Sequence, residues 1–155
     1  MQPDLWSFAT HCYGQPGVEH ACLQLQDAGA DVCLLLSGLW LEQRGVPCNA
    51  ERLHHLHAIA KPWQDQVVRP LRALRQNWRA GATSDARLHA LREQVKALEL
   101  ESERELLLSL EAQMETWPAD SSHNKPSWLE PLLGPVEKAN RDALNLLRAA
   151  ATTAA

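Results

Sequence analysis

Leucine, alanine, glutamine, glutamate and arginine recur along this chain at spacings of three and four residues, and no stretch alternates cleanly between apolar and polar side chains as a strand would. Aromatic residues make up only 5% of the chain, and β-branched residues are sparse. These residue types favour helices, and their spacing gathers apolar side chains on one helical face. We therefore predict an all-α fold: a single-domain bundle of about five or six helices with one long amphipathic helix.

Turn residues and helix caps set the expected boundaries of the helices. The run from Val32 to Leu41 is apolar on nearly all sides, which places its helix at the centre of the bundle. Asn49 is expected to cap the next helix, in which Pro62 and Pro70 each remove a hydrogen bond and should kink or split it. Ser84 or Asp85 is expected to cap the long helix. The predicted helices cover about residues 3–13, 18–26, 30–45, 50–79, 85–117 and 128–150.

The length of 155 residues fits one domain, predicted over residues 1–150, followed by a frayed tail at 151–155. The longest apolar run is too short to span a membrane, and the first residues carry Asp4 where a signal peptide needs basic residues. We therefore expect a cytoplasmic protein that does not insert into a membrane. In that reducing compartment the four cysteines, none of which lies in a CxxC motif, are expected to be free thiols.

Charge is divided unevenly into three blocks of net charge −5, +6 and −5, over residues 1–43, 44–96 and 97–155. Two interpretations stay open. The acidic first third and the basic middle could pack face to face, or each could face a different partner.

The first third also carries a dense series of specific residues, which can be written LWxFAxxxYxxPGVxxACLxLQD over residues 5–27 and DVxLLLxxxWL over residues 31–41. With these residues the chain resembles an uncharacterised proteobacterial family, a domain of unknown function, and residues 63–72 are similar to that family as well. The chain departs from the family at Cys33, where many relatives have Asn. The resemblance covers about half of the chain and implies no established activity.

A candidate ligand site combines acids and arginines. If the turn around Gly29 stays helical, Asp27 and Asp31 project from one face, a spacing at which paired carboxylates can hold Mg²⁺ on a diphosphate. The candidate site consists of these two acids, the neighbouring amide Gln26, and the stripe Arg69, Arg72 and Arg75. The alternative interpretation is structural: Asp31 caps the following helix, and Asp27 pairs with an arginine of the middle block.

Other patterns give weaker indications. His54 and His57 share a helical face, and His11, Cys12, His20 and Cys22 lie close in sequence, but their spacings match no zinc site, so we predict no metal and no cofactor. The arginine stripe raises nucleic acid as a partner, which the overall pI near 5.9 disfavours. The alternative is that these arginines pair with the acids of the first third or with the exposed acidic stretch at 99, 101, 103 and 105.

Six tryptophans are unusual beside one tyrosine and one phenylalanine. Trp6, Trp40 and Trp63 are expected in the core. The tryptophans at predicted helix ends are candidate interface residues: Trp78, Trp117 and Trp128.

No complete catalytic constellation is present, and whether the chain is an enzyme stays open, with a non-enzymatic role favoured. The leading hypothesis is a cytosolic helical interaction or accessory protein with a protein partner. A small-ligand or diphosphate-binding protein is the alternative, and contact with nucleic acid is the second. Homo-oligomerisation is left open.

Overall fold

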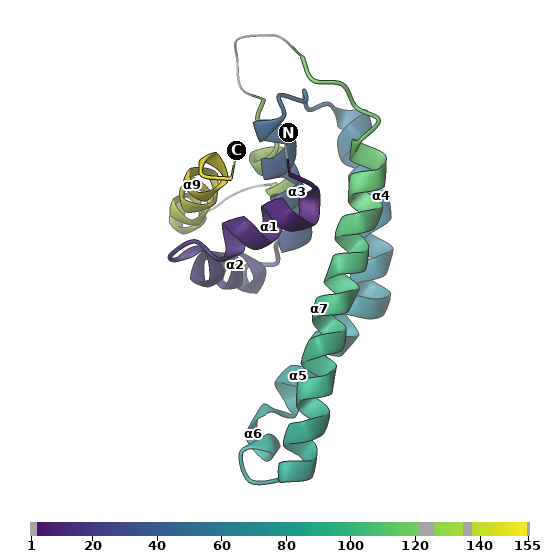
Figure 1. Ribbon diagram of the computed structural model, residues 1–155, viewed down its shortest axis with the longest axis vertical. Coiled ribbons are helices and arrows are strands. Elements are labelled where there is room, and N and C mark those ends of the chain that lie inside the picture. The colour runs from purple at the N-terminus through teal and green to yellow at the C-terminus, as the bar shows by residue number, and fades with distance from the viewer. Residues whose placement is uncertain (1–2, 121–125, 135–137, 155) are drawn as a thin grey trace.

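The computed structural model describes residues 3–120, 126–134 and 138–154, and in these ranges every regular element is helical. A body and a projecting arm make up the molecule (Figure 1). The body contains α1 (Leu5–Tyr13), α2 (Val18–Asp27), α3 (Val32–Gln43), α4 (Ala50–Trp63), α8 (Leu129–Leu133), α9 (Lys138–Thr152) and the C-terminal half of α7 (Ala86–Met114). We call residues 64–98 the arm: η1 (Gln64–Val68), α5 (Arg69–Asn77), α6 (Arg79–Ala82) and the first half of α7.

α3 lies at the centre of the body, as its apolar sequence predicts. Every residue from Cys33 to Glu42 is buried, because α1, α4, α7, α8 and α9 surround this helix. Gly38 allows α8 to come close, since a Cβ at this position would lie 2.8 Å from a methyl carbon of Leu132. The all-α class, the single domain and the long helix α7 are therefore confirmed.

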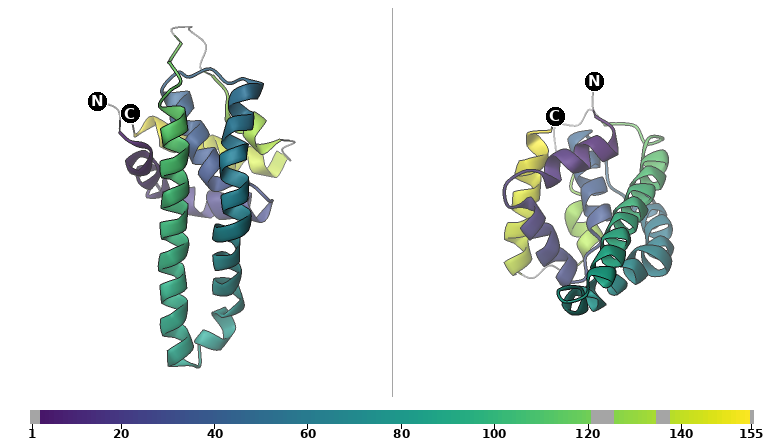
Figure 2. Two further views of the ribbon diagram at one scale, coloured as in Figure 1. Left: turned by 90° about the vertical axis from the view of Figure 1, so that its right-hand side faces the viewer. Right: turned by 60° about the horizontal axis from the view of Figure 1, so that its bottom comes forward.

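The two prolines of the middle segment do not split it. Between Pro62 and Pro70 the chain adopts η1, a π-helical turn in which the Arg69 amide donates to the Gln64 carbonyl five residues earlier. Proline clashes with the carbonyl four residues before it, and the wider turn before Pro70 relieves that conflict. The expected break is therefore wrong, and α4, η1 and α5 follow one another without interruption alongside α7 (Figure 2, left).

The two halves of α7 pack against different parts of the molecule. Its C-terminal half is buried against the body through Leu106, Leu107 and Leu110. Its N-terminal half packs on α5 and α6 beyond the body, and α5 itself has no buried residue (Figures 1 and 2). The predicted caps Asn49 and Asp85 are confirmed, because each side chain accepts hydrogen bonds from the first turn of its helix.

The C-terminal region differs from the prediction of one helix over residues 128–150. α8 ends at Leu133, where Gly134 adopts a φ of 78°, and α9 begins at Lys138. α9 continues to Thr152 with Ala151 fully buried, so the helix extends past the point at which the frayed tail was expected. None of the helices in the described ranges has the length and apolar character needed to cross a membrane.

Two of the three tryptophans proposed as interface residues lie in the core instead. Trp117 and Trp128 are buried and stack at 5.9 Å between ring centroids, with the Trp128 indole donating to the Val46 carbonyl at 2.7 Å. Trp78 is half-buried at the end of α5. Of the tryptophans expected in the core, Trp40 is buried, whereas Trp63 is 37% exposed.

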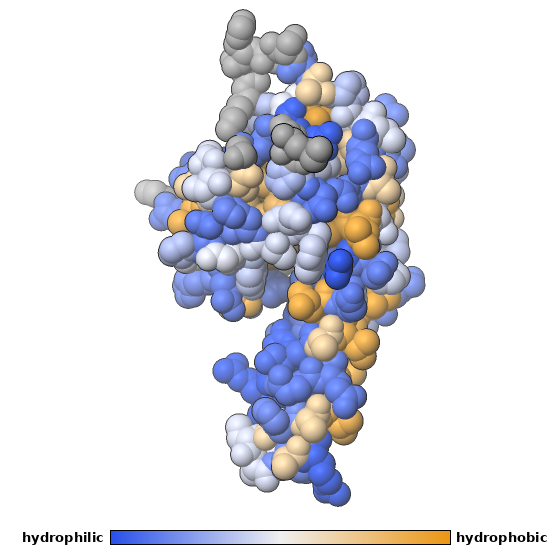
Figure 3. Space-filling view, viewed as in Figure 1, coloured by the Kyte–Doolittle hydropathy of each residue, from blue (hydrophilic) through white to orange (hydrophobic). Residues whose placement is uncertain are grey.

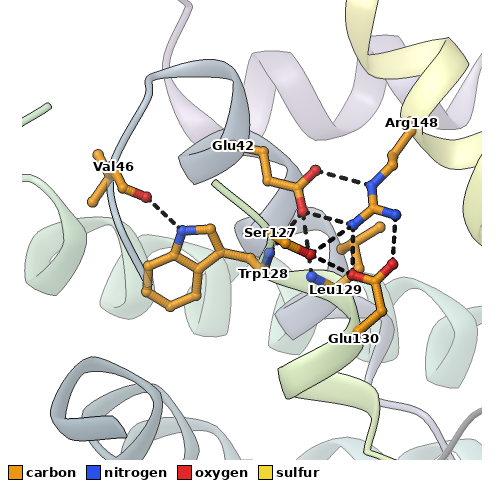
Figure 4. A network of polar contacts seen from close by, with 7 residues as sticks. All are labelled: Glu42, Val46, Ser127, Trp128, Leu129, Glu130 and Arg148. Carbon is orange, nitrogen blue, oxygen red and sulfur yellow. Dashed lines mark hydrogen bonds and ion pairs between the residues drawn. The ribbon is translucent and has the colours of Figure 1, made fainter. Parts of the chain in front are cut away.

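A buried carboxylate joins the ends of α3, α8 and α9 (Figure 4). Glu42 is 6% exposed and accepts from the backbone amides of Trp128, at 2.8 Å, and Leu129, at 3.3 Å. The Arg148 guanidinium donates to the same carboxylate at 3.0 and 3.1 Å. Glu42 thus caps α8 from a distant part of the chain, and Arg148 also holds Glu130, whose pKa it lowers to about 2.

Replacing Glu42 should therefore destabilise the fold strongly. Glu42→Ala leaves two buried backbone donors and part of Arg148 without an acceptor, and we expect a loss of about 3 kcal/mol or more in the free energy of unfolding. Urea denaturation followed by far-UV circular dichroism measures this loss. Glu51→Ala, at an exposed position of α4, is the control and should change the value by less than about 0.5 kcal/mol. Equal losses for the two variants would contradict the capping role.

Candidate functional site at the junction of body and arm

Body and arm meet along a groove of about 400 Å³, which we call the junction groove. Its apolar wall comes from α1, α2, α3 and α7, and its charged floor comes from α5 and α7. The wall contains Trp6, Ala9, Tyr13, Cys22, Leu23, Val32, Cys33, Leu36, Leu100 and Leu107. The volume lies in the range of small-molecule sites.

The floor of the junction groove is a buried ion pair with two arginines. Glu99 is 6% exposed, and its carboxylate accepts from Arg72 Nε at 3.1 Å and from Arg75 Nη2 at 3.2 Å. Arg75 Nε makes a further short bond to the other oxygen of Glu99. Gln26 completes the floor: with its amide oxygen turned to the guanidinium, it accepts from Arg72 Nη1 at 2.8 Å.

Among the groups with a shifted pKa that line the groove, Glu103 has the pKa nearest to neutral pH. It lies one turn after Glu99, 3.9 Å from Arg72 Nη2. Burial raises its pKa to about 7, with Glu99 adding to the rise and Arg72 opposing it. Burial also raises the pKa of Tyr13 and of Cys22 to about 12, and it raises the pKa of Cys33 well above its ordinary value, so these three groups stay protonated at neutral pH.

Asp27 and Asp31 do not form a paired site. The turn between them is not helical, since Gly29 adopts a φ of 95°, and Asp27 is exposed while Asp31 is largely buried. Asp31 caps α3 by accepting from the Leu34 amide at 3.2 Å, which confirms the structural interpretation of this residue. It also accepts from Gln64 Nε2 at 3.0 Å, and burial raises its pKa. Within the described ranges Asp27 makes no hydrogen bond or ion pair, so its predicted pairing with an arginine is wrong.

The arginine stripe is divided in the structure. Arg72 and Arg75 lie in the floor of the groove, whereas Arg69 pairs with Asp65 at 2.6 Å and lines a smaller neighbouring cavity together with Asp31. The predicted pairing with the acids of the last third is confirmed for Glu99 and Glu103, but Glu99 is buried rather than exposed. In the part of the chain that is described, no ion pair links the acidic first third with the basic middle; the two blocks meet instead where α3 packs on α4 and where Gln64 donates to Asp31.

Sequence reasoning therefore brought Gln26, Arg72 and Arg75 into the candidate site, and it named Glu99 and Glu103 as structural partners of the arginines rather than as part of that site. The signal was available in part: residues 72 and 75 are three apart and residues 99 and 103 are four apart, which places each pair on one helical face. Gln64 and Tyr13 gave no such signal, because their positions depend on the π-helical turn and on the packing of α1.

The geometry limits the chemistry of the groove. Both floor arginines are already held by carboxylates, which disfavours the diphosphate and nucleic-acid interpretations of the arginine stripe. Among the described residues, no three histidine, cysteine or acidic side chains converge as metal ligands. All four cysteines are free, as expected.

Comparison with known proteins identifies the family of the chain. A family model with the description "Protein of unknown function (DUF2390)" matches residues 4–110. The match spans every residue that lines the junction groove and ends before α8 and α9. No curated protein and no solved structure matches the chain.

Removing the carboxylate of the floor should cost more stability than removing its exposed neighbours. Glu99→Ala leaves Arg75 without its carboxylate and Arg72 with only the more distant Glu103, and we expect a loss of about 3 kcal/mol in the free energy of unfolding. Glu105→Ala, on the exposed side of the same helix, should change that value by less than about 0.5 kcal/mol. Urea titrations of both variants at one pH provide the comparison, and a loss below about 1 kcal/mol for Glu99→Ala would argue against a structural ion pair.

The raised pKa of Glu103 predicts a characteristic dependence of stability on pH. Because the folded pKa of about 7 exceeds the ordinary value of 4.5, the folded state retains a proton that the unfolded state has lost, and stability should fall as pH rises from about 4.5 to 7. Glu103→Gln removes this pH dependence. The free energy of unfolding of the variant should equal that of the wild type near pH 4.5 and exceed it at pH 8. Chemical denaturation over that pH range tests the prediction, and parallel curves for the two proteins would contradict it.

Proposed function

We propose, from the premise that the chain belongs to the family of unknown function DUF2390, that it is a non-enzymatic helical binding protein whose junction groove receives an apolar segment of a partner protein. One observation carries this proposal: large apolar side chains stand exposed around a concave groove at the junction of body and arm. We also place the protein in the reducing cytoplasm, because all four of its cysteines are free thiols.

The rim of the groove has the composition of a protein interface. Tyr13, Leu23 and Leu100 line it and are 40%, 47% and 58% exposed. These side chains come from three different helices, so they surround the opening rather than standing singly on the surface. Exposed apolar residues gathered around a pocket are typical of sites that receive an aromatic or aliphatic anchor from a partner.

The charges of the groove define the chemistry of that partner segment. Two arginines face two glutamates, and Glu103 is half protonated near neutral pH, so the groove has little net charge. A segment with an apolar anchor and uncharged polar neighbours fits such a site, because it fills the wall without leaving a buried charge unpaired. A phosphorylated or nucleic-acid segment does not fit, since it would have to separate the arginines from Glu99.

A small amphipathic molecule is the second candidate occupant. The volume of about 400 Å³ and the apolar wall suit it as well as an anchor side chain, and Glu103 and Gln26 offer hydrogen bonds at the floor. This alternative predicts a stabilising ligand that acts in the absence of any protein partner.

Photo-crosslinking in the native host distinguishes the two occupants. A benzophenone amino acid at position 23, in the rim, should form a discrete covalent product with one protein, and the same residue at position 108 should not, although Leu108 is an equally exposed leucine of α7 outside the groove. The partner identified by mass spectrometry should then bind the purified chain. Leu100→Glu should weaken that binding at least about tenfold, whereas Leu98→Glu should not change it.

The alternatives give different results. Absence of a specific product from position 23 would overturn the protein partner. Thermal stabilisation of the purified chain by small amphipathic molecules, lost in Leu100→Glu and kept in Leu98→Glu, would then favour the small-ligand role.

A further inference from the structure

A second apolar stripe runs along α7 on the side away from the junction groove. Leu91 and Leu98 are 50% and 56% exposed and seven residues apart. Together with Arg87, Gln94 and Glu101 they follow spacings of four, three, four and three residues, the pattern of a helix that packs on another helix. The groove residues Leu100 and Leu107 project from the opposite side of α7, since the helical period turns them about 180° from this stripe.

α5 continues the same surface. Leu74 is 41% exposed, and the side chain of Arg92 on α7 bonds to the Arg75 carbonyl, which brings Leu74 close to the level of Gln94. The positions of α5 that lie three and four residues from Leu74 share its side of the helix; they are Pro70, Leu71, Asn77 and Trp78, so the middle of the surface carries no charge. We call it the outer face of the arm. The left panel of Figure 2 looks onto this face, with the helices of the arm in front of the body. Figure 3 shows the arm from the side, and orange residues lie along its right-hand edge.

We propose that the outer face binds a second copy of this chain, with the two arms antiparallel about a two-fold axis near Gln94. In this arrangement each α7 lies against α7 of the other copy, and Leu91 of one copy meets Leu98 of the other. Leu74 of one copy lies near Leu74 of the other, close to the axis. The apolar residues of both arms then become covered in a bundle of four helices.

The ends of the stripe identify the second copy as the occupant. Arg87 and Glu101 lie seven residues to either side of Gln94, so the two-fold axis places Arg87 of one copy beside Glu101 of the other, twice in the dimer. The Arg87 side chain is 93% exposed, and its pairing with Asp85 at 3.7 Å is long, which leaves it free to reach a new carboxylate. If the two arms were parallel, α7 of one copy would lie over α5 of the other, and neither Arg87–Glu101 pair could form.

The shape of the molecule permits this contact. The body lies behind the arm as seen from the outer face, so it does not obstruct a second copy (Figure 2, left). The stripe from 87 to 101 is about 21 Å long and two helices are about 20 Å wide, which gives an interface at the small end of specific protein contacts. We therefore expect a reversible dimer with a dissociation constant in the micromolar range. Because the junction grooves lie on the opposite side of each arm, both stay accessible in the dimer.

Sedimentation velocity over about 1–300 µM tests the proposal. The wild type should shift from monomer to dimer as concentration rises. Leu98→Glu, which would bury a carboxylate opposite Leu91, should weaken the dimer at least about 30-fold. Leu100→Glu is the matched control: it lies two residues away at nearly the same exposure, 58% against 56%, and should leave dimerisation unchanged. A wild type that is monomeric throughout, or an equal effect of both variants, would overturn the proposal.

Exchanging the charges tests the antiparallel register. Arg87→Glu alone and Glu101→Arg alone should each weaken the dimer several-fold, and the double variant should restore it, because each exposed pair occurs twice. Circular dichroism confirms folding of each variant, and Leu98→Ser replaces Leu98→Glu if the latter does not fold. Additive losses in the double variant would overturn the register. Failure of this dimer leaves the junction groove untouched, since Leu98→Glu and Leu100→Glu separate the two surfaces.

Discussion

A carboxylate buried between two arginines determines how the arm leaves the body. Glu99 lies at the point on α7 where burial against the body ends, and Arg72 and Arg75 on α5 hold it from the opposite helix of the arm. Three charges removed from water are stable only as a set, because each depends on the others for its solvation. The two helices of the arm are therefore fixed in register at the junction, where α5 itself buries no apolar residue. The same three side chains form the floor of the groove, so the element that orients the arm also decides what the groove can bind.

Glu42 and Glu99, which are buried carboxylates in the described part of the chain, have different tasks. Glu42 is surrounded by backbone donors and one arginine, and it replaces the missing cap of α8 within the body. Glu99 meets only side chains, all of them from α5, and it faces a cavity. Glu103 lies at the same cavity, and its nearest cation, Arg72, is 3.9 Å away and already bonded to Glu99, which explains why burial dominates the pKa of Glu103. The two arginines are already paired with Glu99, and Glu103 beside them can be protonated or ionised near neutral pH. Such a cluster suits recognition of an uncharged group better than binding of an anion.

The outcome of sequence reasoning depended on whether a feature is local. Caps such as Asn49 and Asp85, the central position of α3 and the length of α7 follow from residues within one or two turns, and the sequence predicted them. Trp117 and Trp128 were assigned to an interface because they lie at helix ends, yet their mutual stacking is a contact between segments whose approach no local pattern encodes. The same holds for Glu99: within an alternating acidic series it looks exposed, and only the neighbouring α5 determines which acids turn inward. At Pro62 and Pro70 the local rule predicted a break, and the wider turn of η1 overrode it at the cost of one irregular hydrogen bond.

α7 carries three surfaces on one helix, and their separation follows from the helical period. Val95, Glu99 and Ser102 face α4, η1 and α5; Leu100, Glu103 and Leu107 face the groove; and Leu91 and Leu98 face outward. A helix of 29 residues that is apolar in three directions has little net amphipathic character along its whole length, although each stripe taken alone is regular. The stripe of Val95, Glu99 and Ser102 is covered by other helices of the same chain. The stripe in the groove and the outward stripe are open to solvent on opposite sides of the arm. Because the open stripes share no residue, occupation of one does not block the other, and a chain paired through its outer face would present two grooves directed away from each other.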